Sequence, residues 1–543
     1  MKTLIFSFAL FLTATQQILS QPAWLWARYG IGNEYDQTSS VIADAAGNVY
    51  ATGYYASDSI MFGNITLLNA AVIDDEDIFI VKYDAAGNMQ WAKRAGGGDN
   101  DRGNALAVDA AGNVYLTGYY QSSTITFDTI TLNNTGNGDI FVVKYDNAGN
   151  VLWAKNEGGL ALEIPHAIDV DDMGNIIVAG RFSSLSITFG TTTLTQAGSM
   201  DVFVVKYDPA GNVLWAKGFG GGSNDECYAV TSDANSNIYI TGHFNQTMMM
   251  GTTSLTTAGI SDMFLAKLDT AGNVMWAMKA GGSGDDRGKA IEADAMGNSY
   301  IGGYFASATM TFGSTTVTNS GSDNSLIAKY DNDGNFVRVA TIGANSRTNA
   351  LTLVNNQVYL CGTFRADTLH YGSSMLLIDG SNDFYVAQID TAGNKGWVVK
   401  QTSGGDGSEQ GIACTSDPSG NIYIGGFFGS DPIAFGPSVF SNTDNGFDMY
   451  VAKLGTGTID VSDVSRNKAF LIYPNPVSSS GTIMFKDDFD GYTAELISIT
   501  GQVVLKQLIV SNRIVLSEMI KPGLYILRLQ NGLEVSTIKL VVK

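Results

Sequence analysis

The chain has 543 residues, too many for one ordinary hydrophobic core, so several domains or an array of repeats are expected. Its 63 glycines, 9 prolines, 45% hydrophobic residues and 15% charged residues are typical of β-structure with many turns and argue against a disordered chain. The formal net charge of −21 argues against nucleic acid and anionic membranes as partners, because both would repel the chain.

Residues 1–20 have the pattern of a secretory signal peptide. Lys2 precedes an apolar run from Leu4 to Leu12, and a polar stretch follows that ends at Ser20. The apolar run is too short to cross a membrane and no later run is longer, so we expect no transmembrane segment. The mature protein is therefore expected to begin at Gln21 and to be exported.

The next region is organised by a repeated strand, turn and strand. The clearest copy runs from Asp139 to Lys155, with alternating apolar residues on both sides of Asp-Asn-Ala-Gly-Asn. Because Asp146 can bond the turn backbone and Gly149 can adopt a positive φ, this copy is expected to form a bulged β-hairpin. The copies follow one another at spacings of 59 to 65 residues, which predicts a repeat architecture. They align on Lys82, Lys144, Lys206, Lys267, Lys329, Gln388 and Lys453.

Each repeat contains four strand signals, which we name A to D in chain order. In the second copy they are residues 105–110, 113–120, 139–146 and 150–155. Turns of the pattern Asp-x-x-Gly-Asn join A to B and C to D in most copies. Four antiparallel strands in succession form a meander, which is the blade of a β-propeller.

The two ends of this region predict a closed ring. The last repeat stops after strand C, whereas Ala23 to Gly30 match a strand D that has no repeat of its own. Adding this segment to the last sheet would cover an exposed edge and fasten the ring. We therefore predict an all-β chain in which residues 21–455 form a seven-bladed β-propeller of four-stranded blades, closed by the N-terminal strand.

The repeat resembles a known family. The pattern Asp-x-x-Gly-Asn-x-Tyr-x-x-Gly-x-aromatic, followed by Phe-x-x-Lys-Tyr-Asp-x-x-Gly-Asn-x-x-Trp, is similar to the bacterial seven-bladed β-propeller repeats of the SBBP type. The sixth copy departs from it, because Val-Asn-Asn-Gln-Val-Tyr replaces the first turn and Gln388 replaces the lysine. The resemblance implies the fold and little about chemistry, since propellers host both binding proteins and enzymes.

Residues that recur in every repeat are most simply explained by the fold. The tryptophans of strand D are expected to pack between blades, and they are Trp91, Trp153, Trp215, Trp276 and Trp397. The polar residues that begin strand C are expected to cap backbone donors in preference to binding a cation, and they are Asp77, Asp139, Asp201, Asp262, Asn324, Asp383 and Asp448.

A ligand site should be built from residues that break the repeat. If strand A is innermost and runs from a top face to a bottom face, both repeated turns lie at the bottom, and the D to A and B to C connections lie at the top. At the top we expect the variable end of strand B, which is Tyr54, Tyr119, Arg181, His243, Tyr304, Thr363 and Phe427. The D to A loops are expected to add charged residues near the central opening, namely Asp101, Arg102, Asp225, Glu226, Asp286, Arg287 and Glu409. An alternative is that the strand B residues are ordinary half-buried strand ends.

The B to C connections are about twenty residues long and contain a second hairpin-like signal. Long ordered connections on a rigid scaffold often carry binding sites, so we expect these also to contribute to the top face. In several copies a phenylalanine precedes the turn of this hairpin, and Phe127, Phe189, Phe312 and Phe435 are examples.

Catalysis and metal binding find little support. The three histidines, His166, His243 and His370, are scattered, and no common catalytic motif occurs. The three cysteines are odd in number and lack metal-ligand spacing, so they are expected to be small buried hydrophobes. The acidic loops could hold Ca²⁺, but none has EF-hand spacing, so we predict no metal, no cofactor and no enzyme activity.

A second pattern follows the repeats. Residues 456–468 form a polar linker, and seven short strand signals in 469–543 predict a small β-sandwich. These residues resemble the type A C-terminal sorting domain of the Bacteroidetes type IX secretion system. The landmarks of that resemblance are Tyr473, Pro474, Asn475, Pro476, Gly501, Gly523, Tyr525 and Lys539. It implies the type IX machinery as a partner, passage through the periplasm, and a final place outside the cell or on its outer surface.

Together these features predict a secreted or cell-surface propeller that acts as a binding or adhesion module, with a glycan or an envelope protein bound at the top face. Two alternatives stay open. One is a structural surface protein without a small ligand, and the other is a glycan hydrolase or lyase that uses paired acids of the top face.

Overall fold

The computed structural model describes residues 22–70, 75–404, 407–442, 446–455, 472–479, 481–485, 489–498, 503–516, 520–531 and 534–543. Within them the regular secondary structure consists of 49 strands and includes no helix, so the all-β prediction is confirmed. The chain divides into two compact units, of which the first is Gln21–Gly457 and the second contains Thr458–Lys543. The predicted signal peptide, the linker and Gly501 lie outside the described residues.

The first unit contains seven antiparallel sheets, numbered here in chain order, each with four successive strands A to D. Strands A are β2 (Asp36–Ala43), β8 (Asp101–Val108), β14 (Ile164–Val170), β20 (Asp225–Ser232), β26 (Asp286–Ala293), β32 (Ser346–Val354) and β38 (Glu409–Ser416). Strands B are β3 (Val49–Tyr55), β9 (Val114–Tyr120), β15 (Ile176–Phe182), β21 (Ile238–Phe244), β27 (Ser299–Phe305), β33 (Gln357–Phe364) and β39 (Ile422–Phe428).

The outer half of each sheet is formed by strands C and D. Strands C are β6 (Asp77–Tyr83), β12 (Asp139–Tyr145), β18 (Asp201–Tyr207), β24 (Asp262–Leu268), β30 (Asn324–Tyr330), β36 (Asp383–Asp390) and β42 (Asp448–Gly455). Strands D are β7 (Met89–Ala95), β13 (Val151–Glu157), β19 (Val213–Gly221), β25 (Val274–Ala280), β31 (Phe336–Ala344), β37 (Lys395–Val399) and, for sheet 7, β1 (Ala23–Tyr29).

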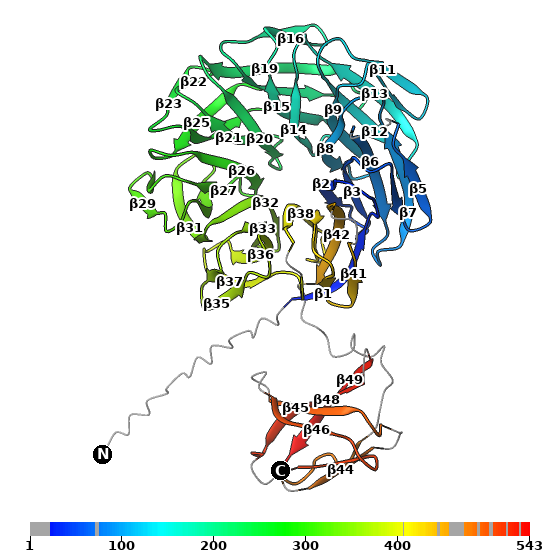
Figure 1. Ribbon diagram of the computed structural model, residues 1–543. Coiled ribbons are helices and arrows are strands. Elements are labelled where there is room, and N and C mark those ends of the chain that lie inside the picture. Colours follow the sequence, from blue (N-terminus) through cyan, green and yellow to red (C-terminus); the bar gives the residue numbers. More distant parts are fainter. Residues whose placement is uncertain are drawn as a thin grey trace, which may run out of the picture. The chain divides into compact units, whose positions relative to one another are not determined.

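The sheets are arranged around a central channel. Each strand A contacts the strands A of the two neighbouring sheets, and β38 contacts β2, which completes the circle. All seven strands A line one channel of about 310 Å³. Figure 1 shows the sheets arranged in a circle with the strands A innermost. Strands B and C are almost wholly buried, because their apolar side chains pack against the neighbouring sheets on both faces.

The N-terminal strand completes the last sheet, as predicted. β1 pairs antiparallel with β42, with Ala27 opposite Ala452. Trp26 of β1 donates a hydrogen bond from Nε1 to the carbonyl oxygen of Ala85 in sheet 1, at 3.2 Å. Trp91 makes the same contact with Asn147 of the next sheet, also at 3.2 Å. The junction that closes the circle is therefore built like the others.

The expected packing role of the strand D tryptophans is confirmed. A Cβ added to Gly149 would come within 2.9 Å of the Trp91 ring, and one added to Gly211 within 3.3 Å of the Trp153 ring. A glycine in the turn thus lets the indole of the preceding sheet lie against the backbone. Sheet 5 has Arg338 in place of the tryptophan, and its side chain lies against Gly393.

The repeated turns are held by their first aspartate. Asp109 accepts hydrogen bonds from the backbone amides of Ala111 and Asn113 and from the side chains of Asn113 and Tyr115, at 2.7 to 3.1 Å. The repeated lysine of strand C adds to this group, since Lys206 Nζ lies 2.8 Å from Asp171 in sheet 3. The aspartates at the start of strand C are caps, as expected, because Asp139 accepts a hydrogen bond from the Thr135 amide at 3.0 Å.

The B to C connections do not lie where we expected. Each contains a hairpin that packs along the outer strand D, at the periphery of the circle (Figure 1). The hairpin tip reaches the bottom end of strand D, where Asp128 accepts a hydrogen bond from the Val151 amide. Phe127, Phe189, Phe312 and Phe435 are at most 1% exposed and belong to the core. The outer strand has an open edge and an apolar face, and the hairpin covers them.

The peripheral hairpins have the following bounds. They are β4 (Ser59–Phe62) with β5 (Ile65–Leu68), β10 (Thr124–Phe127) with β11 (Ile130–Asn133), β16 (Ser186–Phe189) with β17 (Thr192–Thr195), β22 (Thr247–Met250) with β23 (Thr253–Thr256), β28 (Thr309–Phe312) with β29 (Thr315–Thr318), β34 (Thr368–Tyr371) with β35 (Ser374–Leu377), and β40 (Ile433–Phe435) with β41 (Ser438–Phe440). β22 also pairs with β19, so sheet 3 continues into the hairpin of sheet 4.

The second unit has seven strands among its described residues, in two sheets. One sheet has the order β43 (Ile472–Tyr473), β44 (Thr482–Phe485) and β47 (Arg513–Val515). The other has the order β46 (Val503–Leu508), β45 (Thr493–Ser498), β48 (Gly523–Asn531) and β49 (Glu534–Val542). Side chains from both sheets form one apolar cluster, with Ile483 and Leu527 completely buried.

Several of the sorting landmarks hold the last strand. Asn475, between Pro474 and Pro476, donates a hydrogen bond to the carbonyl oxygen of Lys539 at 2.8 Å and accepts one from the Val541 amide at 2.9 Å. Gly523 begins β48, and Tyr525 in the same strand donates a hydrogen bond to Lys521 at 2.7 Å. Tyr473 is about half exposed.

Candidate functional site at the top of the channel

The site begins with an irregularity shared by all seven strands A. Each has a β-bulge near its start, after the third residue in six of them, as between Gly103 and Ala105 in β8, and after the second in β14. A bulge adds one residue to one strand and turns a side chain to a new direction. The bulge residues are Ser39, Asn104, His166, Tyr228, Lys289, Asn349 and Ile412. All are partly exposed.

Two residues before the bulge, each strand A pairs with the variable end of strand B. Arg102 lies opposite Tyr119, and Arg287 lies opposite Tyr304. The strand A partners are Gln37, Arg102, Ile164, Glu226, Arg287, Arg347 and Gln410. We call these seven residues and the seven bulge residues the mouth. Between sheets 1 and 3 the mouth contains a hollow of about 250 Å³.

The aromatic residues expected at the top face lie at the mouth but are nearly buried. Tyr54, Tyr119, His243, Tyr304 and Phe427 are 5 to 7% exposed. The guanidinium carbon of Arg102 lies 4.2 Å from the ring centre of Tyr54, and that of Arg347 lies 4.3 Å from the ring centre of Tyr304. Strand A side chains therefore cover the rings that we expected to face a ligand.

Asp101 and Asp286 are placed differently from our expectation. They belong to strand A, which begins earlier than predicted, and both are completely buried. Asp101 accepts hydrogen bonds from the Gly97 amide and from the Ser122 hydroxyl, at 2.8 and 2.7 Å. Burial raises the pKa of Asp101 to about 7 despite these bonds. Each aspartate thus ties the strand to its own sheet, while the adjacent Arg102 and Arg287 reach the mouth.

A network of charges joins sheets 3 and 4 at the mouth. Glu226 lies 2.8 Å from both His166 Nε2 and Arg181 Nε, and it accepts a hydrogen bond from the Tyr228 hydroxyl at 2.6 Å. Burial opposes ionisation of Glu226, but the contacts with His166, Tyr228 and Arg181 hold its pKa well below the usual range. Burial lowers the pKa of His243 to about 4, and the charge of Arg287 contributes. Glu226 is therefore a satisfied anion.

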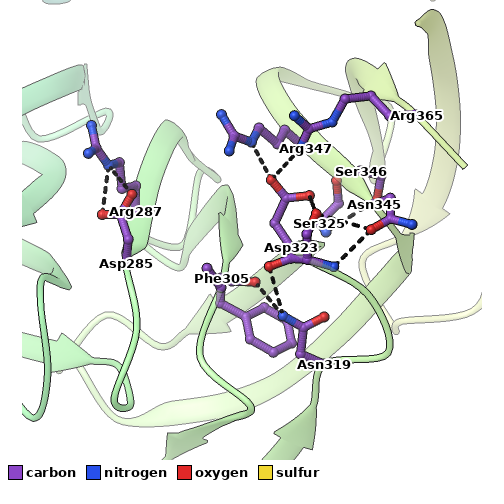
Figure 2. Close-up of polar contacts among 12 residues, drawn as sticks. Asp285, Arg287, Phe305, Asn319, Asp323, Ser325, Asn345, Ser346, Arg347 and Arg365 are labelled. Atoms are coloured by element: carbon purple, nitrogen blue, oxygen red, sulfur yellow. Dashed lines mark hydrogen bonds and ion pairs between the residues drawn. The ribbon is translucent and has the colours of Figure 1, made fainter. Parts of the chain in front are cut away.

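Sheets 5 and 6 carry a second network, shown in Figure 2. Arg287 donates a hydrogen bond from Nε to Asp285 at 2.9 Å. Arg347 and Arg365 both contact the same oxygen of Asp323, at 2.5 and 2.7 Å, so two guanidinium groups share one carboxylate (Figure 2). The position of Arg347 is fixed from two sides, by Asp323 and by the ring of Tyr304.

Lys289 is the most unusual residue of the mouth. Its ammonium lies 3.4 Å from the ring centre of Tyr228, a cation–π contact. Within the described residues it has no ion pair with a carboxylate. Burial, together with the charges of Arg287 and Arg347, lowers the pKa of Lys289 to about 8, although the charge of Glu226 acts in the opposite direction. The lysine lies in the channel wall with an aromatic partner and, among the described residues, no carboxylate within ion-pair distance.

The described residues show no group of three or more His, Cys, Asp or Glu side chains that could hold a metal ion. The described part of the chain also contains no helix with the length and hydropathy needed to cross a bilayer. The three cysteines are free and buried, as expected.

The sequence did not predict Arg347 at the mouth, nor the bulge residues, among them Tyr228 and Lys289. The signal was present. Counted from the position of Asp101 in each repeat, the second residue is of four types and the fourth of six, while the first is acidic in six of the seven repeats and the fifth is alanine or serine. The bulge itself has no sequence mark. Without it, the fourth residue would be assigned by alternation to the buried face.

Two family models match parts of this chain. Residues 471–543 match the family described as secretion system C-terminal sorting domain. The chain carries a type IX sorting domain. Residues 90–119 match the family described as β-propeller repeat, which confirms the resemblance to the SBBP repeat. The sorting domain marks proteins that type IX secretion exports to the cell surface or beyond, so the protein is a secreted propeller.

Similar proteins were found at low identity. An uncharacterized WD repeat-containing protein of Acanthamoeba polyphaga mimivirus is 25% identical over 442 residues, which cover 65% of this chain and 32% of that protein. The regulatory protein FlaEY of Caulobacter vibrioides is 25% identical over 395 residues, covering 67% of this chain and 40% of that protein. The chain thus spans about a third to two fifths of the length of these relatives.

Two solved structures illustrate the structural matches. The Neurospora crassa Pan2 WD40 domain is 9% identical, with 81% of this chain and 99% of that chain covered and a TM-score of 0.39. PorZ, a surface component of the type IX secretion system of Porphyromonas gingivalis, is 11% identical, with 93% and 74% covered and a TM-score of 0.32.

Proposed function

We propose that this protein is a seven-bladed β-propeller with a small β-sandwich sorting tail, and that the propeller is a binding or adhesion module that holds a glycan or an envelope protein at its mouth. The proposal includes no catalysis. Its main support is the contrast between the uniform bottom turns and a mouth at which the pair of side chains changes between neighbouring sheets, with six different pairs in seven sheets. Binding sites on repeat scaffolds are usually built from such non-repeated residues.

The proposed site extends across the channel. One part of the mouth, in sheets 3 to 6, is rich in charge. The other, in sheets 6, 7, 1 and 2, offers amides and a hydroxyl beside Arg102, which pairs with Glu76. In the second part Asn104 and Asn349 donate hydrogen bonds to carbonyl oxygens of the next sheet, at 2.8 Å in both cases. These bonds fix the amides and pre-organise the mouth, which lowers the entropic cost of binding.

The test is a screen of the purified full-length protein against immobilised glycans and envelope proteins, followed by affinity measurements. A variant with Gln37→Ala, Arg102→Gln and Gln410→Ala should lose at least about tenfold in affinity for any ligand found. The matched control carries Gln90→Ala and Lys155→Met, which are exposed on outer strands β7 and β13, and it should bind like the wild type. Equal affinity of both variants would move the site away from the mouth.

The two alternatives predict other results. A structural surface protein should form ordered assemblies and show no saturable ligand. A hydrolase or lyase should release products from a glycan substrate, at a rate that falls when mouth carboxylates such as Glu226 are replaced.

A further inference from the structure

The charged part of the mouth has more cations than anions. In sheets 5 and 6, Arg287, Lys289, Arg347 and Arg365 face two carboxylates, Asp285 and Asp323. The nearby Glu226 is taken up by His166, Arg181 and Tyr228, and Asp286 is completely buried beneath the strand. This local surplus of positive charge occurs in a chain with a net charge of −21, so it is not a consequence of composition.

The surplus cations have hydrogen-bonding capacity left. Arg347 contacts Asp323 through Nε, and its two terminal nitrogens have no hydrogen bond among the described residues. Figure 2 shows these nitrogens pointing away from Asp323, on the side of Arg287. Lys289 has three donors, and among the described residues its one contact is with the Tyr228 ring. Arginine and lysine placed in this way match an oxyanion, because charge-assisted hydrogen bonds are strongest when both partners are ionised.

The rest of the mouth narrows the ligand class. In sheets 6, 7, 1 and 2 its uncharged polar residues are Gln37, Ser39, Asn104, Asn349 and Gln410, and Arg102 and Ile412 lie among them. Amides and hydroxyls both donate and accept hydrogen bonds, which is what a row of sugar hydroxyls requires. A ligand with hydroxyls and a carboxylate on the same unit would satisfy both parts at once. A channel of about 310 Å³ admits a single such unit and not a folded domain.

We infer that the mouth binds an acidic saccharide and holds one of its carboxylates between Lys289 and Arg347, with Arg287 beside them. This inference rests on the proposed function and specifies its ligand. An acidic peptide would satisfy the cations but would leave the amide part of the mouth with fewer hydroxyl partners.

The experiment uses isothermal titration calorimetry with the full-length protein and three probes: trigalacturonate, the neutral maltotriose, and tri-glutamate. Trigalacturonate should bind, and its affinity should fall as sodium chloride is added, because salt screens the charges. Lys289→Met and Arg347→Gln should each weaken it about tenfold or more. The control Lys155→Met removes an exposed lysine from an outer strand and should change nothing. Thermal melts identify any variant that fails to fold.

The possible failures are distinct. If maltotriose binds as tightly as trigalacturonate, and its binding is lost in the Gln37→Ala, Arg102→Gln, Gln410→Ala variant but not in Lys289→Met, the mouth is a binding site and the acidic ligand is wrong. If tri-glutamate binds more tightly than trigalacturonate, the saccharide class is wrong. If none of the three binds, the inference is overturned, while the broader screen still tests the proposed function.

Discussion

The two ends of the inner strands A differ in how much their side chains vary between sheets. At the bottom end, the side chains of the turn bond to the turn itself, as Asp109 does with Asn113, and the same residues recur in nearly every sheet. At the top end, the bulge turns one side chain per strand toward the channel, and these side chains differ from sheet to sheet. Residues whose partners belong to the backbone are repeated because the backbone is repeated, whereas residues that face the channel are free to vary.

The largest effect is expected at the bottom end of the closing strand. Trp26 is 7% exposed and packs on the turn of sheet 1, where its Nε1 donates to Ala85. Trp26→Ala should lower the free energy of unfolding by about 3–5 kcal/mol, because it removes a large buried ring at the junction that closes the circle. Urea denaturation measures this. Gln410→Ala at the mouth is the control and should change stability by less than about 0.5 kcal/mol. A loss below about 1 kcal/mol for Trp26→Ala would show that the junction contributes little.

A smaller loss is expected from a single bottom turn. Asp109→Ala removes four hydrogen bonds, among them the one from the Asn113 side chain. It also removes the anion that lies 3.8 Å from Nζ of the buried Lys144. We expect a loss of about 2 kcal/mol, since unsatisfied partners add to the lost bonds. Asp109→Asn keeps one acceptor and should lose less. Ligand affinity should stay at the wild-type value in both variants, and a parallel fall in affinity would contradict the separation of the two ends.

The channel between the two ends should make stability depend on pH. Burial, together with the charge of Asp169, raises the pKa of Glu292 to about 8. In the unfolded chain a glutamate titrates near about 4.3, so between these values the folded state keeps a proton that the unfolded state has lost. This contribution to stability is complete below about pH 4 and is lost as the pH rises toward 8.

Glu292→Gln removes that titration. Stability of the variant should therefore fall less steeply between pH 5 and pH 8, by up to about 1.4 kcal/mol per pH unit, and thermal unfolding at several pH values measures the difference. Gln410→Ala should keep the wild-type slope. An unchanged slope for Glu292→Gln would mean that water in the channel already solvates the carboxylate.

The repeated parts of the fold could be predicted from the sequence more fully than the variable top end of the inner strands. The closing strand, the tryptophans and the turn aspartates were predictable, because one local pattern recurs and each copy supports the others. The sorting domain was predictable from the order of its landmarks, such as Tyr473 and Gly523.

The mouth was predictable only in part. The variable ends of strand B, such as Tyr119, were found, but their burial under Arg102 and its counterparts depends on contacts between neighbouring sheets. Asp101 was expected to face the opening because it is charged, whereas it is a buried cap of its own sheet. Lys289 was missed because a bulge shifts the alternation of faces without any sequence signal. Hydrophobic periodicity therefore identifies elements better than it identifies where irregular residues point.

The smallest effect on stability is expected at Gly218, which departs from the repeat on an outer strand and belongs to neither end of the inner strands. In sheets 1, 4 and 6 a cation on strand D pairs with the aspartate that begins strand C, as Lys279 does with Asp262 at 2.7 Å. Sheet 3 has Gly218 there, and Asp201 faces a hollow of about 640 Å³. A Cβ at Gly218 would lie 3.7 Å from the nearest atom, in Leu194, so a side chain fits.

Gly218→Lys should restore the missing pair and stabilise the protein by about 0.5–1 kcal/mol, from the pairing of a partly exposed ammonium with Asp201 and from the lower flexibility of a non-glycine residue in a strand. Gly218→Gln separates the two contributions, because it provides a side chain without a charge, and the difference between the variants should shrink at high salt. Neither should alter binding at the mouth. If Gly218→Lys weakened ligand binding, the hollow beside Asp201 would also belong to the binding site, and the site would not be confined to the mouth.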